Sequence, residues 1–257
     1  MDERIKIRIM NLNRELLQKK FGKSIIINEN LSKYTWFNVG GPADIFFRPK
    51  NKEELLNLLN EVKNYKKKIH ILGAGSNTLI RDKGVEGIVI KLSSNFSEMK
   101  IIGKDMIEVG AAALDRKVSD FATNNNIGNM EFLSCIPGSI GGAITMNSGC
   151  YGTDISQILS SINIIDDKGL EKEIKKDEIE FFYRGTNLPK NYIIISATLK
   201  GFLGSKDQIK KRQEDLIKKK KISQPNQIKT GGSTFKNSNS KKAWMLIKES
   251  GCDKLYI

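Results

Sequence analysis

Two glycine-rich segments hold the residue types best suited to binding a phosphate-bearing ligand. The first, ILGAGSNTLIRD at residues 71–82, runs from an apolar stretch into a glycine turn. Glycines let a backbone approach a phosphate closely, and free amides together with the Ser76 and Asn77 side chains can surround a diphosphate. A Rossmann fingerprint is not indicated, because the third glycine is missing and no helical pattern follows. Taken alone, the segment is explained equally well as a plain turn.

The second glycine segment, IPGSIGGAITMNSGCYG, spans residues 136–152. Its density of glycines predicts a long backbone surface with few side chains, which can lie against a flat or diphosphate-bearing ligand. A flexible linker is the competing interpretation. Apolar residues interleave the glycines and argue against it: Ile136, Ile140, Ile144 and Met146.

Two further motifs contain candidate catalytic side chains. In FFYRGTN, Arg184 follows aromatic residues, where a planar guanidinium could bind a carboxylate in a dry pocket. In TGGSTFKN, residues 230–237, Ser233 follows a glycine pair on a turn where its hydroxyl could donate a proton. Each motif, considered singly, also has a purely structural explanation.

Composition restricts the remaining chemistry. The chain has one histidine, His70, and three cysteines without CxxC spacing, which argues against multi-histidine metal sites, cysteine zinc sites and a disulfide framework. The net charge of +14 suits an anionic partner. Lysines outnumber arginines 35 to 8, and no nucleic-acid-binding motif is present, so we expect an anionic small molecule and not a nucleic acid.

A chain of 257 residues can form one large domain or two small ones. The apolar runs are far shorter than the roughly 20 residues of a membrane helix, and the charged N-terminus lacks the apolar core of a signal peptide. We therefore expect a cytoplasmic protein without membrane contact.

Periodicity predicts a mixed α+β fold. Helices are expected up to residue 21 and at 52–65, 114–125 and 206–221, and strands at 70–72, 87–92, 107–109, 161–165 and 192–199. The sequence becomes strongly charged after Gly204, and we place a domain boundary there. The lysines of 218–221 are also explained as a solvated helix face.

Taken in order, seven motifs resemble the family of UDP-N-acetylenolpyruvoylglucosamine reductases, flavoenzymes of peptidoglycan precursor synthesis. The motifs are YTWFNVGGPADIFF (34–47), GAGSNTLIRDKG (73–84), the second glycine segment, FYRGT, QP (224–225), GGSTFKN and AWMLIKESG (243–251). The similarity extends from about residue 32 to the end of the chain.

The resemblance implies an N-terminal helical segment (1–31), a two-lobed FAD-binding domain of the PCMH type (32–203) and a smaller α+β substrate-binding domain (204–257). It also implies noncovalent FAD, NADPH as co-substrate, UDP-N-acetylglucosamine enolpyruvate as substrate and a monomer. The family transfers hydride to the methylene carbon of the enolpyruvyl ether, and the product is UDP-N-acetylmuramate.

The resemblance further implies roles for individual residues. Arg184 matches the catalytic arginine and Ser233 the proton donor, with Lys221 or Lys236 as a supporting cation. Tyr183, Lys221 and Asn237 match substrate-contact positions. The implied FAD-binding residues are Gly73, Ala74, Gly75, Ser76, Asn77, Thr78, Leu79, Pro137, Gly138, Ser139, Gly142, Asn147 and Gly149.

Departures from the family pattern leave a second interpretation open. Cys135 replaces the glycine usual before IPG, and Ser238 replaces the proline usual after FKN. The family continues beyond the position of Ile257 with a segment that contains an assisting glutamate. We therefore expect a truncated chain, and its alternative function is that of a flavin-binding remnant without turnover.

Overall fold

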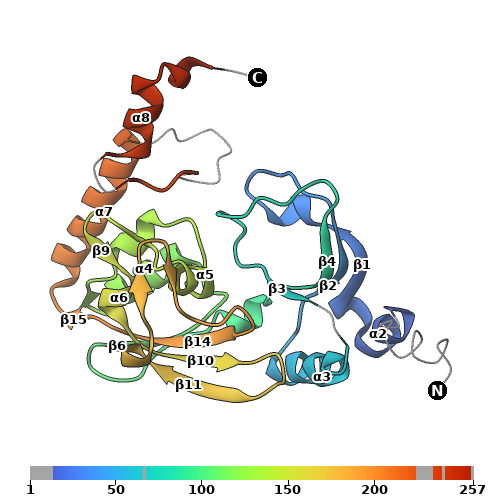
Figure 1. Ribbon diagram of the computed structural model, residues 1–257. Coiled ribbons are helices and arrows are strands. Elements are labelled where there is room, and N and C mark those ends of the chain that lie inside the picture. Colours follow the sequence, from blue (N-terminus) through green and yellow to red (C-terminus); the bar gives the residue numbers. More distant parts are fainter. Residues whose placement is uncertain (1–13, 66–67, 224–233, 239–240, 256–257) are drawn as a thin grey trace.

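The computed structural model describes residues 14–65, 68–223, 234–238 and 241–255, which form two lobes followed by a long helix (Figure 1). The first lobe contains α2 (Arg14–Phe21), β1 (Ile25–Asn30), β2 (Pro42–Phe47), α3 (Lys52–Val62), β3 (Ile69–Ile71) and β4 (Val85–Ile90). Its sheet has the order β1-β2-β4-β3. Strand β1 is antiparallel to β2, whereas β2, β4 and β3 run parallel.

Apolar patterning explains these elements. Both faces of β4 are buried toward its end, which agrees with its almost continuous run of β-branched residues. Helix α3 begins where the Asn51 side chain accepts a hydrogen bond from the Glu54 amide at 2.9 Å. Its apolar residues at helical spacing are fully or almost fully buried, as the sequence predicts: Leu55, Leu58, Leu59 and Val62.

The structure differs from the sequence-based expectation at the start of the chain. Residues 14–21 are helical as expected, but residues 25–30 form strand β1 instead of continuing a helical segment. The β-branched run Ile25–Ile27 pairs with Ile45–Phe47 of β2, so this part of the N-terminal segment belongs to the first sheet.

The second lobe is built on a five-stranded antiparallel sheet of order β11-β10-β14-β6-β5. These strands are β5 (Met99–Ile101), β6 (Met106–Gly110), β10 (Leu159–Ile165), β11 (Glu171–Lys175) and β14 (Ile193–Lys200). The helices of this lobe are α4 (Asp115–Asn124), α5 (Ile140–Thr145) and α6 (Ile155–Ile158). Short paired strands connect them: β7 (Ile127–Gly128) with β15 (Phe202–Leu203), β8 (Gly149–Cys150) with β9 (Thr153–Asp154), and β12 (Phe181–Phe182) with β13 (Gly185–Thr186).

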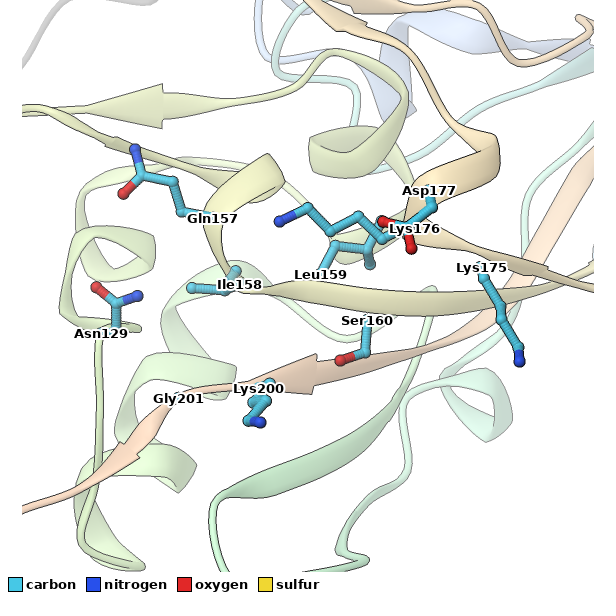
Figure 2. Close-up of a pocket in the computed structure, with 10 residues that line it drawn as sticks. All are labelled: Asn129, Gln157, Ile158, Leu159, Ser160, Lys175, Lys176, Asp177, Lys200 and Gly201. Carbon is cyan, nitrogen blue, oxygen red and sulfur yellow. The ribbon is translucent and has the colours of Figure 1, made fainter.

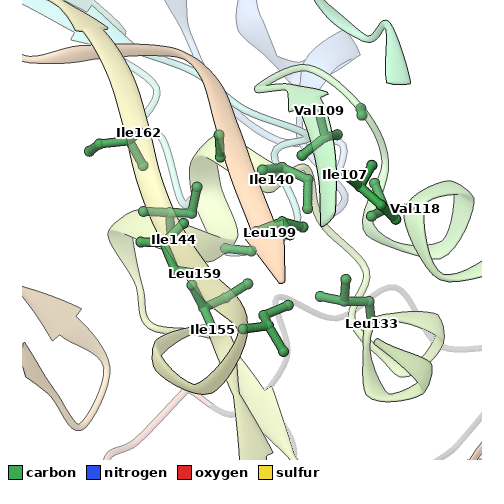
Figure 3. Packing of buried hydrophobic residues seen from close by; sticks show 14 of the residues in the cluster. Ile107, Val109, Val118, Leu133, Ile140, Ile144, Ile155, Leu159, Ile162 and Leu199 are labelled. Atoms are coloured by element: carbon green, nitrogen blue, oxygen red, sulfur yellow. The ribbon is translucent and has the colours of Figure 1, made fainter. Parts of the chain in front are cut away.

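A large apolar core lies between this sheet and the helices (Figure 3). Ile140 and Ile144 of α5 are both fully buried in it. Part of the second glycine segment is therefore a short helix instead of the long loop that its glycine content suggests. The two isoleucines lie four residues apart, and burying them on one helix face outweighs the low helix propensity of glycine.

The two lobes share a second apolar core. Ile165 of β10 and Ile193 of β14 are buried in the same cluster as Phe47 and Leu58 of the first lobe. This shared burial fixes the first sheet relative to the second, because apolar interiors pack as densely as crystals and resist displacement.

Helix α7 (Lys206–Ser223) packs along the second lobe, and α8 (Ala243–Glu249) lies beyond it (Figure 1). Ile209 is fully buried, and the Arg212 Nε lies 2.8 Å from the Glu131 Oε1. The Gln213 side chain donates hydrogen bonds to Ser119 and Asp120 of α4. The start of the expected substrate-binding domain is therefore attached to the second lobe, and the boundary near residue 204 stays a prediction. Within the described ranges, no helix combines the length and apolar character required to cross a bilayer.

The core makes a first prediction. Ile162→Ala removes a fully buried side chain of β10 and is expected to lower the free energy of unfolding by about 2–5 kcal/mol. Leu170→Ala, at a position 65% exposed, serves as the control and should change it by about 0.5 kcal/mol or less. Urea denaturation at a fixed flavin concentration measures both, and equal effects would contradict this core assignment.

Candidate functional site

The first glycine segment leaves the sheet directly after β3, and its residues 73–79 are called the glycine loop below. The Trp36 amide donates a hydrogen bond to the Gly75 carbonyl at 3.1 Å. Gly75 has a φ of +74°, and a Cβ atom there would lie 1.9 Å from the Tyr34 carbonyl oxygen. Glycine is therefore required at this position for two reasons, the left-handed backbone and the lack of space.

The glycine loop presents unpaired donors. None of the consecutive amides from Gly73 to Leu79 donates a hydrogen bond to another described residue. Backbone amides without partners are rare in folded proteins unless water or a ligand satisfies them. A row of such amides on a glycine turn is the arrangement that binds phosphate groups, so the loop fits the diphosphate of FAD.

The two glycine segments meet at Ser139. A Cβ atom on Gly73 would lie 3.0 Å from the Ser139 Oγ, and one on Gly142 would lie 3.9 Å from the same atom. Ser139 itself is 5% exposed, and its hydroxyl has no hydrogen-bond partner among the described residues. Pro137 and Gly138 directly precede it in the same stretch of chain. The structure thus brings the two glycine segments together at Gly73, Ser139 and Gly142, and the contact of these residues with FAD stays a prediction.

A buried acidic side chain packs against the second glycine segment at Gly138. Asp115, at the start of α4, is fully buried, and neither carboxyl oxygen has a partner among the described residues. A Cβ atom on Gly138 would lie 2.5 Å from the Asp115 Oδ2. Burial raises the pKa of this carboxyl well above its usual range. Glycine at 138 is required to make room for it.

The last two predicted flavin contacts have local structural partners. The Asn147 Oδ1 accepts a hydrogen bond from the Ser156 amide at 3.1 Å, at the start of α6. A Cβ atom on Gly149 would lie 2.5 Å from the Asp154 Cβ across the β8–β9 hairpin. Both residues therefore shape the end of the second glycine segment, and their contact with flavin stays a prediction.

Arg184 lies at the tip of a hairpin. Strands β12 and β13 leave Tyr183 and Arg184 as the two connecting residues, and Arg184 has a left-handed backbone with φ of 63°. Its guanidinium lies over the Tyr183 ring, 5.7 Å from the ring centre. Thr186 Oγ1 donates a hydrogen bond to the Thr145 carbonyl at 3.4 Å and so joins the hairpin to the end of α5. Strained residues of this kind cluster at functional sites.

The hairpin also contacts the C-terminal part of the chain. The Asn237 amide donates to the Tyr183 hydroxyl at 3.4 Å, while the Asn237 Oδ1 accepts from the Ala243 amide at the start of α8. Two predicted substrate contacts, far apart in sequence, therefore lie side by side. Tyr183 is 55% exposed, so the dry pocket expected around Arg184 is not formed by this hairpin alone. Lys221 is an exposed residue of the last turn of α7, and Ser233 lies outside the described residues.

A separate polar pocket of about 450 Å³ is lined by none of the predicted site residues (Figure 2). Its lining comes from β10, β14 and the turn after β11, and includes Lys175, Lys176, Asp177 and Lys200. It belongs to the opposite end of β10 and β14 from the buried pair Ile165 and Ile193 that joins the lobes.

Three residues at the glycine segments were not predicted from the sequence: Arg48, Lys91 and Asp115. Lys91 Nζ donates a hydrogen bond to the Gly73 carbonyl, and the charge of Arg48 is close enough to affect Lys91. Each of the two cations directly follows a buried strand. Their positions in the sequence predict that they lie close together only once the two strands are known to be parallel neighbours. The sequence does not single out Asp115, because acidic residues are common in the first turn of a helix.

The cysteines provide a test of this packing. Cys135 and Cys150 flank residues 136–149 and interact with each other, and burial raises the pKa of the Cys150 thiol to about 12. At pH 8 such a thiol is ionised about 1000-fold less than one with the ordinary pKa of 9.0. With a thiol reagent at pH 8, we expect the exposed Cys252 to react first, and Cys150 to react only on unfolding. Cys252→Ser should remove the fast phase, and a fast phase that remains in this variant would contradict the packing.

Comparisons with known proteins agree with this geometry. A family model described as an FAD binding domain matches residues 43–175. The UDP-N-acetylenolpyruvoylglucosamine reductase of Pelagibacter ubique is 45% identical over 234 residues, which cover 90% of this chain and 77% of that protein. The enzyme of the same name from Gluconobacter oxydans is 42% identical over 230 residues, covering 90% and 74%.

The fold agrees as well. The crystal structure of UDP-N-acetylenolpyruvylglucosamine reductase (MurB) from Thermus caldophilus is similar to this chain, with a TM-score of 0.79 and 29% identity. The similarity covers 91% of this chain and 81% of that one. On these relatives, the matching FAD-binding family model and the shared fold, the chain belongs to the UDP-N-acetylenolpyruvoylglucosamine reductase family of FAD-dependent oxidoreductases.

Proposed function

We propose that this chain reduces UDP-N-acetylglucosamine enolpyruvate to UDP-N-acetylmuramate, with NADPH as the source of hydride. The observation that supports it most directly is the row of amides at Gly73–Leu79 that have no partner among the described residues, on a loop whose Gly73 approaches Ser139 so closely that a Cβ there would lie 3.0 Å from the Ser139 Oγ. The basic character of the chain suits both substrates, because each contains a diphosphate.

FAD, when bound, supplies hydride transfer between the nicotinamide and the methylene carbon of the enolpyruvyl ether. The residues that would hold it are those of the glycine loop together with Pro137, Gly138, Ser139 and Gly142. Asn147 and Gly149 would lie on the isoalloxazine side. The amides of the glycine loop bind and orient the diphosphate, and the buried second segment excludes water from one side of the cofactor.

Arg184 stabilises the charge that develops on the substrate. Hydride addition to the methylene carbon places negative charge on the adjoining carboxylate as an enediolate. A guanidinium that is already in place when this charge forms lowers the barrier without reorganising. The contact with Tyr183 and the short hairpin hold Arg184 ready for this role.

Ser233 donates the proton to the neighbouring carbon. A serine hydroxyl is a weak acid, so a cation must stabilise the alkoxide that remains, and Lys221 or Lys236 has this role. Tyr183 and Asn237 contact the substrate, and the 3.4 Å hydrogen bond between them joins the first part of the chain to the C-terminal part.

The flavin-binding assignment is tested by a charge placed on the glycine loop. Asn77→Asp adds a carboxylate on an exposed side chain beside the expected diphosphate. We expect FAD affinity to fall about 10- to 100-fold, since like charges repel in a partly desolvated site, while the melting temperature of the flavin-free protein stays unchanged. Quenching of flavin fluorescence measures the affinity. Asn60→Asp, the same change on the exposed side of α3, should leave it within about twofold.

The catalytic assignment is tested by separating the two half-reactions. NADPH should bleach the flavin of the anaerobic wild-type protein, and UDP-N-acetylglucosamine enolpyruvate should restore its colour. Arg184→Ala is expected to leave bleaching intact and to slow the return about 100- to 1000-fold, because it removes a cation used only in the second step. Lys190→Ala, which removes an exposed charge in the loop after β13, is the control.

The outcomes separate the candidate functions. Equal slowing of both half-reactions by Arg184→Ala would contradict the role given to Arg184. Bleaching without return of colour in the wild-type protein would identify a flavin-binding protein without turnover. A chain that binds no FAD would overturn the assignment of both glycine segments.

A further inference from the structure

Three strands of the first sheet end at the same edge, beside the glycine loop. Phe47 of β2 and Ile71 of β3 are both in register with Ile90 of β4, and all three strands run parallel. The residues that follow, Arg48, Lys91 and the start of the glycine loop, therefore lie next to one another. The carboxyl edge of parallel strands is where such sheets bind ligands.

Lys91 is fixed between β2 and the glycine loop. Its amide donates to the Phe47 carbonyl at 2.9 Å, and its ammonium group donates to the Gly73 carbonyl. In a trans peptide the carbonyl and the following amide point in opposite directions. Holding the Gly73 carbonyl toward Lys91 therefore turns the Ala74 amide away from it, to the side on which the loop presents its unpaired donors.

Two cations, Lys91 and Arg48, lie close together at this edge of the sheet. Burial lowers the pKa of Lys91, and the charge of Arg48 lowers it further. Neither cation forms an ion pair with a carboxylate among the described residues. Two adjacent cations, one of them largely removed from water, are unfavourable without an anion. An anionic group that binds at the glycine loop would balance the charges of Lys91 and Arg48.

We propose that Lys91 is a positioning residue of the FAD diphosphate subsite. Its ammonium group orients the Gly73–Ala74 peptide so that the loop amides face the diphosphate, and its charge, with that of Arg48, is neutralised by that diphosphate. This inference rests on the proposed function, because it assumes that the glycine loop binds FAD.

The competing explanation is purely structural, with Lys91 acting as a tie between β4 and the loop. The two explanations differ in what happens to the flavin-free protein. A structural tie stabilises the fold whether or not FAD is present. An unbalanced cation in a partly buried position does not, so its removal leaves the flavin-free protein as stable as before or more stable.

The experiment compares Lys91→Met and Lys91→Arg in the flavin-free full-length chain. Lys91→Met keeps the length of the side chain but removes the charge and the donor. We expect it to lower FAD affinity about 10- to 100-fold, measured by quenching of flavin fluorescence, and to leave the melting temperature equal or higher. Lys91→Arg keeps charge and donor and should retain affinity within a few-fold. Raising the salt concentration should weaken FAD binding less in Lys91→Met than in the wild type.

Lys104→Met, an exposed lysine between β5 and β6, is the charge-matched control and should bind FAD like the wild type. Wild-type affinity in Lys91→Met, together with the loss expected for Asn77→Asp, would overturn this proposal and leave the proposed function standing. A lower melting temperature in Lys91→Met without restoration of affinity by Lys91→Arg would show a structural tie and also overturn it. Unchanged affinity in both Lys91→Met and Asn77→Asp would overturn the FAD assignment of the loop itself.

Discussion

The close approach of the Gly73 backbone to Ser139 is the constraint on which the candidate site depends. Gly73 belongs to the edge of the parallel sheet, and Ser139 to the start of α5 on the other lobe. Their distance is set by the core that joins the lobes, where Ile165 and Ile193 pack against the first sheet. A shift of this core would open the gap between the glycine segments, because dense packing transmits displacement to the surface.

Charge explains why this gap suits an anion. Within the described part of the chain, the amides of the glycine loop have no partners, and Lys91 and Arg48, which lie beside the loop, form no ion pair with a carboxylate. The buried acid that packs against Gly138, Asp115, has a pKa raised by burial, which favours its uncharged form. A diphosphate therefore meets donors and positive charge at the glycine loop, which is the electrostatic requirement for binding it.

Arg184 illustrates how the second lobe holds a reactive group in a fixed position. The hairpin that contains Arg184 is short, and its left-handed backbone is held by pairing on both sides. The bond from Thr186 to Thr145 fixes the hairpin to α5, the same helix that Ser139 precedes. The arginine hairpin and the second glycine segment are thus attached to the same helix, which allows a guanidinium to be preorganised for a charge that appears only during the reaction.

The sequence by itself determined the α+β class and the two glycine segments, because hydrophobic periodicity and glycine requirements are local properties of the chain. It also predicted helices α2, α3, α4 and α7 and strands β3, β4, β6, β10 and β14. It did not predict β1, whose strand character comes from pairing with β2, or α5, whose glycines are outweighed by burial of Ile140 and Ile144. Arg48 and Lys91 look like ordinary residues after a strand until the register places them side by side. That register is decided by packing between segments about 40 residues apart, and only the tertiary structure contains it.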